Sequence, residues 1–237
     1  MNEPSAIAAV TFDVGQTLTS LDTRMLADRI TLLGGRASLA RIDGALADAW
    51  RAYDEAVRSG ATSNTWKAFM SALLAGAGER SELIPRLVEQ LWREQPTRNL
   101  WRRPVDGMID VVDALRAAGV PVGIVSNSEG RVAELLEELG WLDRFAVVAD
   151  SGRLGVEKPD PRIFAYACDA MGVSPDRVVH IGDSRSADVD GALRAGMRAI
   201  WFRGGSDGLP AARARTCSTP GQVREVLAQW GAPLPRS

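Results

Sequence analysis

The chain has 237 residues, of which 46% are hydrophobic and 24% are charged, and its formal net charge is −2. This composition is typical of a globular protein, and the small net charge gives no reason to expect nucleic acid or an anionic membrane as a partner. No apolar run is long enough to span a membrane, and residues 1–6 lack the basic and apolar parts of a secretory signal. Two cysteines give no disulfide framework, so we expect a protein of the reducing cytoplasm.

The first predicted element is a buried strand at residues 6–12, which is short, apolar and followed by a turn that contains glycine. The next segment, residues 20–100, is rich in Ala, Leu, Arg and Glu, with apolar residues at helical spacing. This spacing predicts helices at 41–57, 64–78 and 81–95. We therefore expect residues 20–100 to form an inserted helical domain.

From about residue 104 the predicted elements alternate. The pattern predicts strands at 120–126, 144–150, 176–182 and 197–202, and helices at 106–119, 128–140, 160–172, 186–196 and 219–230. Such alternation is typical of an α/β fold with a doubly wound parallel sheet, a Rossmann-like core. We expect residues 1–19 and 101–237 to form this core.

Ligands of doubly wound sheets bind at the carboxyl ends of the strands, so the polar residues that follow each strand are candidates for chemistry. These candidates are Asp13, Ser126, Asn127, Asp150, Asp183 and, five residues further on, Asp188. Lys158 lies in the loop "GVEKPDP", and it is one of only two lysines in the chain.

Three acids in one cleft, Asp13, Asp183 and Asp188, repel one another. A divalent cation with Lys158 beside it would compensate this charge, and carboxylates suit a hard ion such as Mg²⁺. An ionised acid close to both the metal and Lys158 can attack phosphorus, which makes Asp13 a candidate nucleophile.

In this order and spacing, four motifs resemble those of the haloacid dehalogenase superfamily of hydrolases, in the branch with a helical cap after the first motif. The motifs are "FDVGQTLT" with Asp13 and Thr17, "VGIVSNS" with Ser126, "GVEKPDPRIF" with Lys158, and "HIGDSRSADVDGA" with Asp183 and Asp188. The resemblance covers essentially the whole chain, with residues 20–100 as the cap that would close over the cleft and select the substrate.

The resemblance implies a role for each matching residue. Asp13 would attack phosphorus, and Ser126 would bind the phosphoryl group with Asn127 beside it. Lys158 would neutralise charge on Asp13 and on the phosphoryl group. Mg²⁺ would be held by the carboxylates of Asp13 and Asp183 and by the main-chain carbonyl of Gly15, with Asp188 in support. Phosphoryl transfer depends mainly on positioning and electrostatic stabilisation, which agrees with these roles.

Gly15 departs from the family pattern. Phosphatases of the superfamily usually have Asp at this position, where it protonates the leaving oxygen and then activates water. The amide of Gln16 cannot replace that acid. Dehalogenases of the superfamily also lack it, but they lack the "GDS" metal motif and use no metal, whereas this chain has both Asp183 and Asp188.

Each candidate also has a purely structural explanation. Asp13 could be a turn residue, Asp183 a helix cap, Asp188 a supporting acid and Ser126 a buried hydroxyl. The single histidine, His180, lies inside a strand and is expected to be a core residue, while Asp150 is expected to shape its loop. The tryptophans at 50, 66 and 92 are expected to be core of the helical domain.

We expect a Mg²⁺-dependent hydrolase of small phosphorylated compounds that acts through an aspartyl-phosphate on Asp13 and favours good leaving groups. Two alternatives remain open at this point. One is a metal-independent dehalogenase, and the other is a catalytically weak homologue that binds a phosphorylated ligand or a protein partner. The sequence does not fix the oligomeric state.

Overall fold

The structure is a computed structural model that describes residues 6–59, 65–205, 208–210 and 212–234. Residues 1–5, on which the expectation about a secretory signal rests, and Asn64, the first residue of one predicted helix, lie outside these ranges. Within the described residues, no helix combines the length and the hydropathy needed to cross a membrane.

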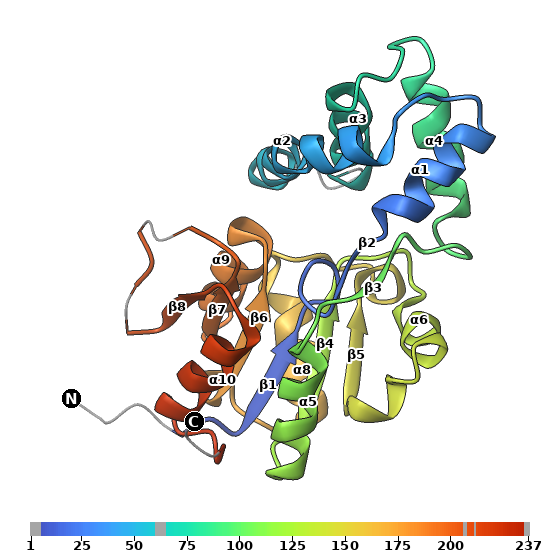
Figure 1. The fold of residues 1–237 in the computed structure, drawn as a ribbon. Coiled ribbons are helices and arrows are strands. Elements are labelled where there is room, and N and C mark those ends of the chain that lie inside the picture. Colours follow the sequence, from blue (N-terminus) through green and yellow to red (C-terminus); the bar gives the residue numbers. More distant parts are fainter. Residues whose placement is uncertain (1–5, 60–64, 206–207, 211, 235–237) are drawn as a thin grey trace. The chain divides into compact units, whose positions relative to one another are not determined.

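The chain divides into two compact units, Met1–Ser20 with Arg103–Ser237, and Leu21–Arg102. The smaller unit contains helices α1 (Thr23–Leu32), α2 (Leu39–Arg58), α3 (Thr65–Gly76) and α4 (Ile84–Glu94) (Figure 1). Its apolar core includes Leu26, Phe69 and Leu73, and the rings of Trp50 and Phe69 lie 4.2 Å apart between centroids. The tryptophans of this unit therefore contribute to its packing, as their helical spacing predicts.

The larger unit is built on a six-stranded sheet with the order β5-β4-β1-β6-β7-β8. The strands are β1 (Ala9–Phe12), β4 (Val122–Ser126), β5 (Val147–Asp150), β6 (Val178–Gly182), β7 (Arg198–Phe202) and β8 (Ala214–Cys217). Every neighbouring pair is parallel. The predicted α/β class with a doubly wound parallel sheet is thus confirmed.

Helices cover both faces of this sheet. The core on one face joins Val10 and Phe12 of β1 to α5 (Met108–Ala117), α6 (Val132–Glu138) and α10 (Pro220–Gln229). The core on the other face joins Ala9 to α8 (Pro161–Met171) and α9 (Asp190–Arg194). Alternate residues of a strand point to opposite faces, and all four residues of β1 are buried, so this strand contributes to both cores.

Short helices complete this unit, and they are η1 (Leu142–Arg144), α7 (Ser151–Leu154), η2 (Pro175–Arg177) and η3 (Arg185–Val189). The helix predicted at 186–196 is confirmed from Arg185 to Arg194, but its first part, η3, is a π-helix and only Asp190–Arg194 is α-helical. The carbonyl of Ser184 accepts from both Asp188 and Val189, which widens the first turn.

Several elements were not predicted. Helix α1 and the edge strand β8 carry weak apolar patterns, and β2 (Thr19–Leu21) pairs with β3 (Trp101–Pro104) in a separate two-stranded sheet. The β3 sequence "WRRP" has two arginines and a proline, a composition that does not indicate a strand.

Candidate active site

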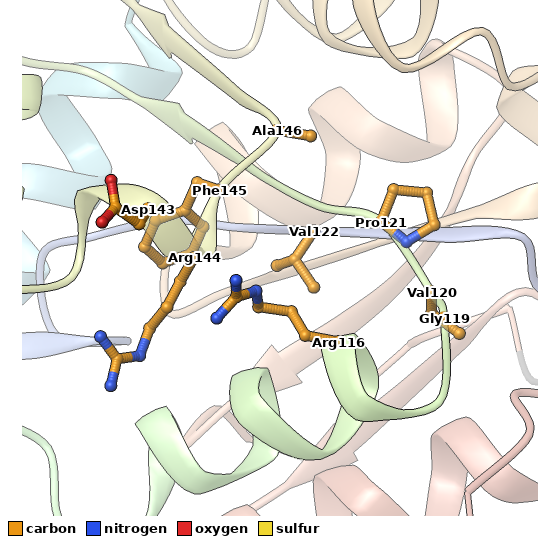
Figure 2. A pocket seen from close by; sticks show the side chains of 9 residues that line it. All are labelled: Arg116, Gly119, Val120, Pro121, Val122, Asp143, Arg144, Phe145 and Ala146. Atoms are coloured by element: carbon orange, nitrogen blue, oxygen red, sulfur yellow. The ribbon is translucent and has the colours of Figure 1, made fainter.

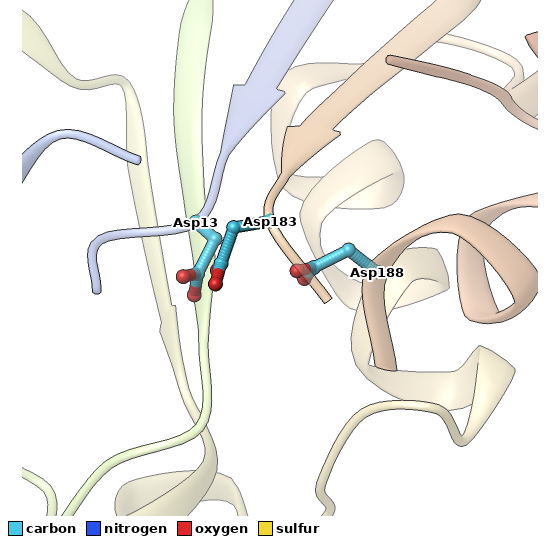
Figure 3. A group of neighbouring side chains, drawn as sticks. All are labelled: Asp13, Asp183 and Asp188. Carbon is cyan, nitrogen blue, oxygen red and sulfur yellow. The ribbon is translucent and has the colours of Figure 1, made fainter. Parts of the chain in front are cut away.

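The centre of the candidate site lies where β1 and β6 end side by side. Phe12 is the register partner of Ile181, and the backbone N–H of Asp13 donates to the Ile181 carbonyl at 2.8 Å. This pairing brings Asp13 and Asp183 to the same carboxyl edge of the sheet. One carboxylate oxygen from each of Asp13, Asp183 and Asp188 lies within 4.8 Å of the other two, and Figure 3 shows the three side chains converging.

Lys158 provides the positive charge of this cluster. Its Nζ atom donates to Oδ1 of Asp13 and to Oδ1 of Asp188, each at 2.6 Å, and the residue is only 4% exposed. Burial alone would lower the pKa of Lys158, but the two carboxylates outweigh this effect and raise it well above its ordinary value. Lys158 therefore remains charged at any physiological pH.

Asn127 fixes the backbone of Lys158. Its side-chain Nδ2 donates to the Lys158 carbonyl at 2.9 Å, and its Oδ1 accepts from the Lys158 N–H at 2.7 Å. Asn127, in the loop after β4, therefore fixes the position of the loop that contains Lys158. Both polar atoms of the Asn127 side chain are used in these hydrogen bonds, so Asn127 would have to contact a phosphate through its main chain. This phosphate contact stays a prediction.

Asp188 reaches the cluster from the π-helical turn η3. Its Oδ1 contacts Lys158 Nζ and His180 Nε2, and its Oδ2 accepts from the Ser184 N–H at 2.9 Å. Gly182 makes room for this carboxylate, since a Cβ there would lie 2.1 Å from Asp188 Cγ. Burial would raise the pKa of Asp188, but the Lys158 charge and the His180 hydrogen bond hold it well below its ordinary value. Both oxygens of Asp188 are thus held by protein donors.

Asp13 has the opposite electrostatic balance. Burial raises the pKa of Asp13 above its ordinary value, the Asp188 charge adds to this effect, and Lys158 opposes it. Among the residues that the structure describes, Lys158 is the hydrogen-bond donor to its carboxylate, through Oδ1. Further positive charge near Asp13 would therefore stabilise its ionised form.

The remaining predicted residues lie close in the fold. Ser126 ends β4, the parallel neighbour of β1, and is buried. Gly15 is half-buried in the turn after Asp13 and forms a β-bridge with Thr19. The hydroxyl of Thr17 is buried and has no hydrogen-bond partner in the described part of the chain. The predicted residues thus lie at the carboxyl edge of the sheet, while their roles remain predictions.

Asp150 shapes its own loop, as its position predicts, and it also holds the loop after β4, which was not predicted. Its Oδ1 accepts from the Ser128 hydroxyl at 2.6 Å and from the N–H groups of Gly130 and Gly152, and its Oδ2 accepts from the N–H of Val132. This single carboxylate fixes the segment that follows Ser126 and Asn127.

Sequence reasoning missed the contact between His180 and the acid cluster. His180 is a core residue as expected, but its ring also lies 3.0 Å from Asp188 Oδ1 and 3.0 Å from the hydroxyl of Thr11. A signal was available, because Thr11 and His180 are the polar residues within two otherwise apolar strands, "AVTF" and "VVHIG".

A surface pocket of about 370 Å³ lies elsewhere (Figure 2). It is lined by residues just before β4 and β5, among them Val120, Pro121 and Phe145, so it belongs to the amino edge of the sheet. The acid cluster lies at the carboxyl edge, where ligands of such sheets bind, and the pocket is not part of it.

The parallel sheet and the buried acid–lysine cluster at its carboxyl edge are features of an α/β hydrolytic enzyme. The sequence model of the haloacid dehalogenase-like hydrolases matches residues 7–196, so the chain belongs to this family. The resemblance seen in the four motifs is thereby confirmed.

Known proteins of related sequence and structure include phosphatases and a dehalogenase. The chain is 29% identical over 205 residues to the glyceraldehyde 3-phosphate phosphatase of Methanopyrus kandleri, covering 84% of this chain and 85% of that protein. A solved phosphatase of the family from Thermococcus onnurineus is 25% identical with a TM-score of 0.58, covering 93% of this chain and 98% of that one. A solved 2-haloacid dehalogenase from Pseudomonas syringae is 26% identical with a TM-score of 0.54, covering 94% and 99%. The chain spans about half the length of other curated relatives that it matches.

Proposed function

We propose that the chain is a phosphatase that hydrolyses small phosphorylated compounds, with Asp13 as the nucleophile and an aspartyl-phosphate as the intermediate. The observation that carries this proposal is the 2.6 Å contact between Lys158 Nζ and Asp13 Oδ1 inside a buried group of acids. A carboxylate held by a permanent positive charge keeps its electron pair available for attack on phosphorus. The phosphatase names among its relatives support the same reaction.

The donor set fits a divalent cation. Three carboxylates and one ammonium leave the cluster with a net charge of −2, which one divalent ion balances. The oxygens of Asp188 are engaged by protein donors, so we propose that Asp13, Asp183 and the Gly15 carbonyl hold Mg²⁺. When bound, Mg²⁺ would neutralise charge on the phosphoryl oxygens.

The other residues position the transferring group. Ser126 at the end of β4 would donate its hydroxyl to a phosphoryl oxygen, and Lys158 would neutralise charge on that group while remaining paired with Asp13. We assign the unit Leu21–Arg102 as the cap that selects the substrate.

Gly15 limits the choice of substrate. Attack on phosphorus needs an ionised carboxylate, which Asp13 supplies, but a simple alkoxide leaves poorly unless it is protonated. General acid catalysis contributes roughly 10²- to 10⁴-fold. We therefore propose that aryl and acyl phosphates react well and sugar phosphates poorly, and that hydrolysis of the phospho-Asp13 intermediate is slow.

The test is a series of phosphate esters of graded leaving-group pKa, measured in single turnover at saturating Mg²⁺. The rate of Asp13 phosphorylation should fall steeply as the leaving group becomes more basic, and Gly15→Asp should flatten the dependence. A flat series in the natural chain would contradict this account of Gly15. Asp13→Asn should abolish turnover, whereas Asp143→Asn, at the exposed opposite edge of the sheet, should leave it unchanged.

The same assay separates the alternatives. Full activity in EDTA together with halide release from 2-haloacids would establish that the chain is a metal-independent dehalogenase. Phosphate binding without turnover of any ester would establish a catalytically weak binding homologue.

A further inference from the structure

Thr11 and His180 form a polar pair inside the apolar centre of the sheet. They are register partners on the adjacent strands β1 and β6, and both side chains are fully buried. Burying a hydroxyl and an imidazole is unfavourable unless both find hydrogen-bond partners. The hydroxyl of Thr11 lies 3.0 Å from His180 Nδ1, so the two residues satisfy each other on one side of the ring.

The other side of the ring contacts the acid cluster. His180 Nε2 lies 3.0 Å from Asp188 Oδ1, the same oxygen that accepts from Lys158 at 2.6 Å. Oδ1 of Asp188 accepts from Lys158 and Oδ2 accepts from the Ser184 N–H, so neither oxygen carries a proton that it could donate to His180. The proton of the ring must therefore be on Nε2.

This assignment fixes the rest of the chain of hydrogen bonds. With the proton on Nε2, Nδ1 of the neutral ring is an acceptor, and the hydroxyl of Thr11 donates to it. Phe164 contacts the imidazole edge-on, with ring centroids 5.1 Å apart and planes at 82°, and so holds the ring plane. A neutral ring in one orientation adds no charge to the cluster.

We propose that His180, oriented by Thr11, is a positioning residue that holds Asp188 so that Lys158 is shared between Asp188 and Asp13. Without the His180 donor, Oδ1 of Asp188 would have Lys158 as its remaining donor and would draw the ammonium away from Asp13. The role of Lys158 in phosphoryl transfer rests on the proposed function, but the hydrogen-bond chain itself does not.

The first experiment does not depend on activity. His180 is the only histidine of the chain, so ¹⁵N-histidine labelling of protein without an affinity tag gives one imidazole signal set. We expect a neutral ring with a slowly exchanging Nε2–H, whose shift changes in Asp188→Asn. A proton on Nδ1, or a ring that exchanges between tautomers, would overturn the proposal.

The second experiment uses two substitutions that differ by one methylene group. In His180→Gln the amide nitrogen can occupy the Nε2 position and donate to Asp188, whereas the shorter side chain in His180→Asn reaches only the Nδ1 position. We expect His180→Asn to lower the single-turnover rate of Asp13 phosphorylation by about 10- to 100-fold with little change in KM. His180→Gln should keep most of the natural rate.

Substitutions at this buried site can destabilise the fold, so the experiment needs a control for unfolding. Both variants are compared at a temperature at which urea unfolding shows them fully folded, and Thr11→Ser is compared with Thr11→Val, since only serine keeps the hydroxyl. Equal losses in His180→Asn and His180→Gln, or no loss in either, would reject a positioning role. If the natural chain turns over no phosphate ester, the proposed function fails, and the imidazole spectrum alone decides this inference.

Discussion

Lys158 Nζ lies 2.6 Å from Asp13 Oδ1, although 145 positions separate the two residues in the chain. The contact exists because β1 brings Asp13 to the sheet edge and Asn127 holds the Lys158 backbone beside it. Asp188 binds the same ammonium group. A substitution of either acid therefore changes the electrostatic environment of the other acid.

Asp183 and Asp188 should respond differently to substitution. Asp188→Asn places an amide against Lys158, His180 and the Ser184 N–H, so we expect it to lower the free energy of unfolding by about 2–4 kcal/mol without Mg²⁺. Asp183→Asn removes one of the three acidic charges of the cluster and should weaken Mg²⁺ binding.

Urea unfolding of both variants with and without Mg²⁺ measures the two effects. The natural chain and Asp188→Asn should both gain stability from the ion, because a ligand that binds only the folded state stabilises it. Asp183→Asn should gain little. An equal Mg²⁺-dependent gain in both variants would contradict the proposed ligand set.

Gly182→Ala should displace Asp188. The new Cβ would lie 2.1 Å from Asp188 Cγ, so the carboxylate or β6 must move. We expect a severe loss of phosphatase activity and a loss of stability above about 1 kcal/mol, as for overpacking. The control is Gly44→Ala in helix α2, where a Cβ meets nothing within 4 Å and should stabilise by about 0.5–1 kcal/mol. Retention of activity by Gly182→Ala would show that Asp188 need not stay in place.

The α/β class and the strand-end residues could be predicted because they follow from local patterns. Apolar runs between amphipathic helices indicate buried parallel strands, and parallel strands share one carboxyl edge, so Asp13, Ser126 and Asp183 had to lie at the same edge of the sheet. No knowledge of strand register was needed for that conclusion.

The contact between His180 and Asp188 could not be predicted in the same way. It depends on the register of Thr11 with His180 and on the π-helical turn that points Asp188 inward. Both depend on how the elements pack together, which the local sequence pattern does not specify. Likewise, the sequence of β8 is too short and too polar to indicate an edge strand, and only its pairing with β7 identifies it.

Asp150→Asn should loosen the loop that follows Ser126. An amide has one acceptor oxygen where the carboxylate has two, so either the N–H of Val132 or the donors to Oδ1 lose their partner. We expect a loss of about 1–3 kcal/mol in the free energy of unfolding and faster hydrogen exchange at residues 128–132. Asp22→Asn, at the N-cap of α1, is the matched control and should change neither, because Asn caps helices as well as Asp. Unchanged exchange in Asp150→Asn would mean that the loop is held by other contacts.

Glu129 should make the stability of the chain fall as pH rises. Burial raises its pKa to about 7 from an ordinary value of 4.5, and the Asp150 charge acts in the same direction. Between these values the folded chain holds a proton that the unfolded chain has lost, so the free energy of unfolding decreases as pH rises through this range. Glu129→Gln should remove this decrease and be more stable than the natural chain at about pH 8, by on the order of 2 kcal/mol.

Urea unfolding at about pH 4 and about pH 8 tests the sign. The difference between Glu129→Gln and the natural chain should be small at the acid value and large at the alkaline one. Glu137→Gln, on the exposed side of α6, should show no such difference. A constant difference at both pH values would assign the effect to packing rather than to ionisation.

The central place of β1 in the sheet has a consequence for synthesis of the protein. β1 leaves the ribosome before every other strand of the sheet, and its two partners, β4 and β6, begin only at Val122 and Val178. The helical unit Leu21–Arg102 is synthesised before β4 and β6, so it can fold while β1 is still unpaired. Asp13 therefore comes next to Asp183 only after β6 has been made, and an interrupted chain that ends before β6 carries Asp13 on a strand with one edge open to other chains.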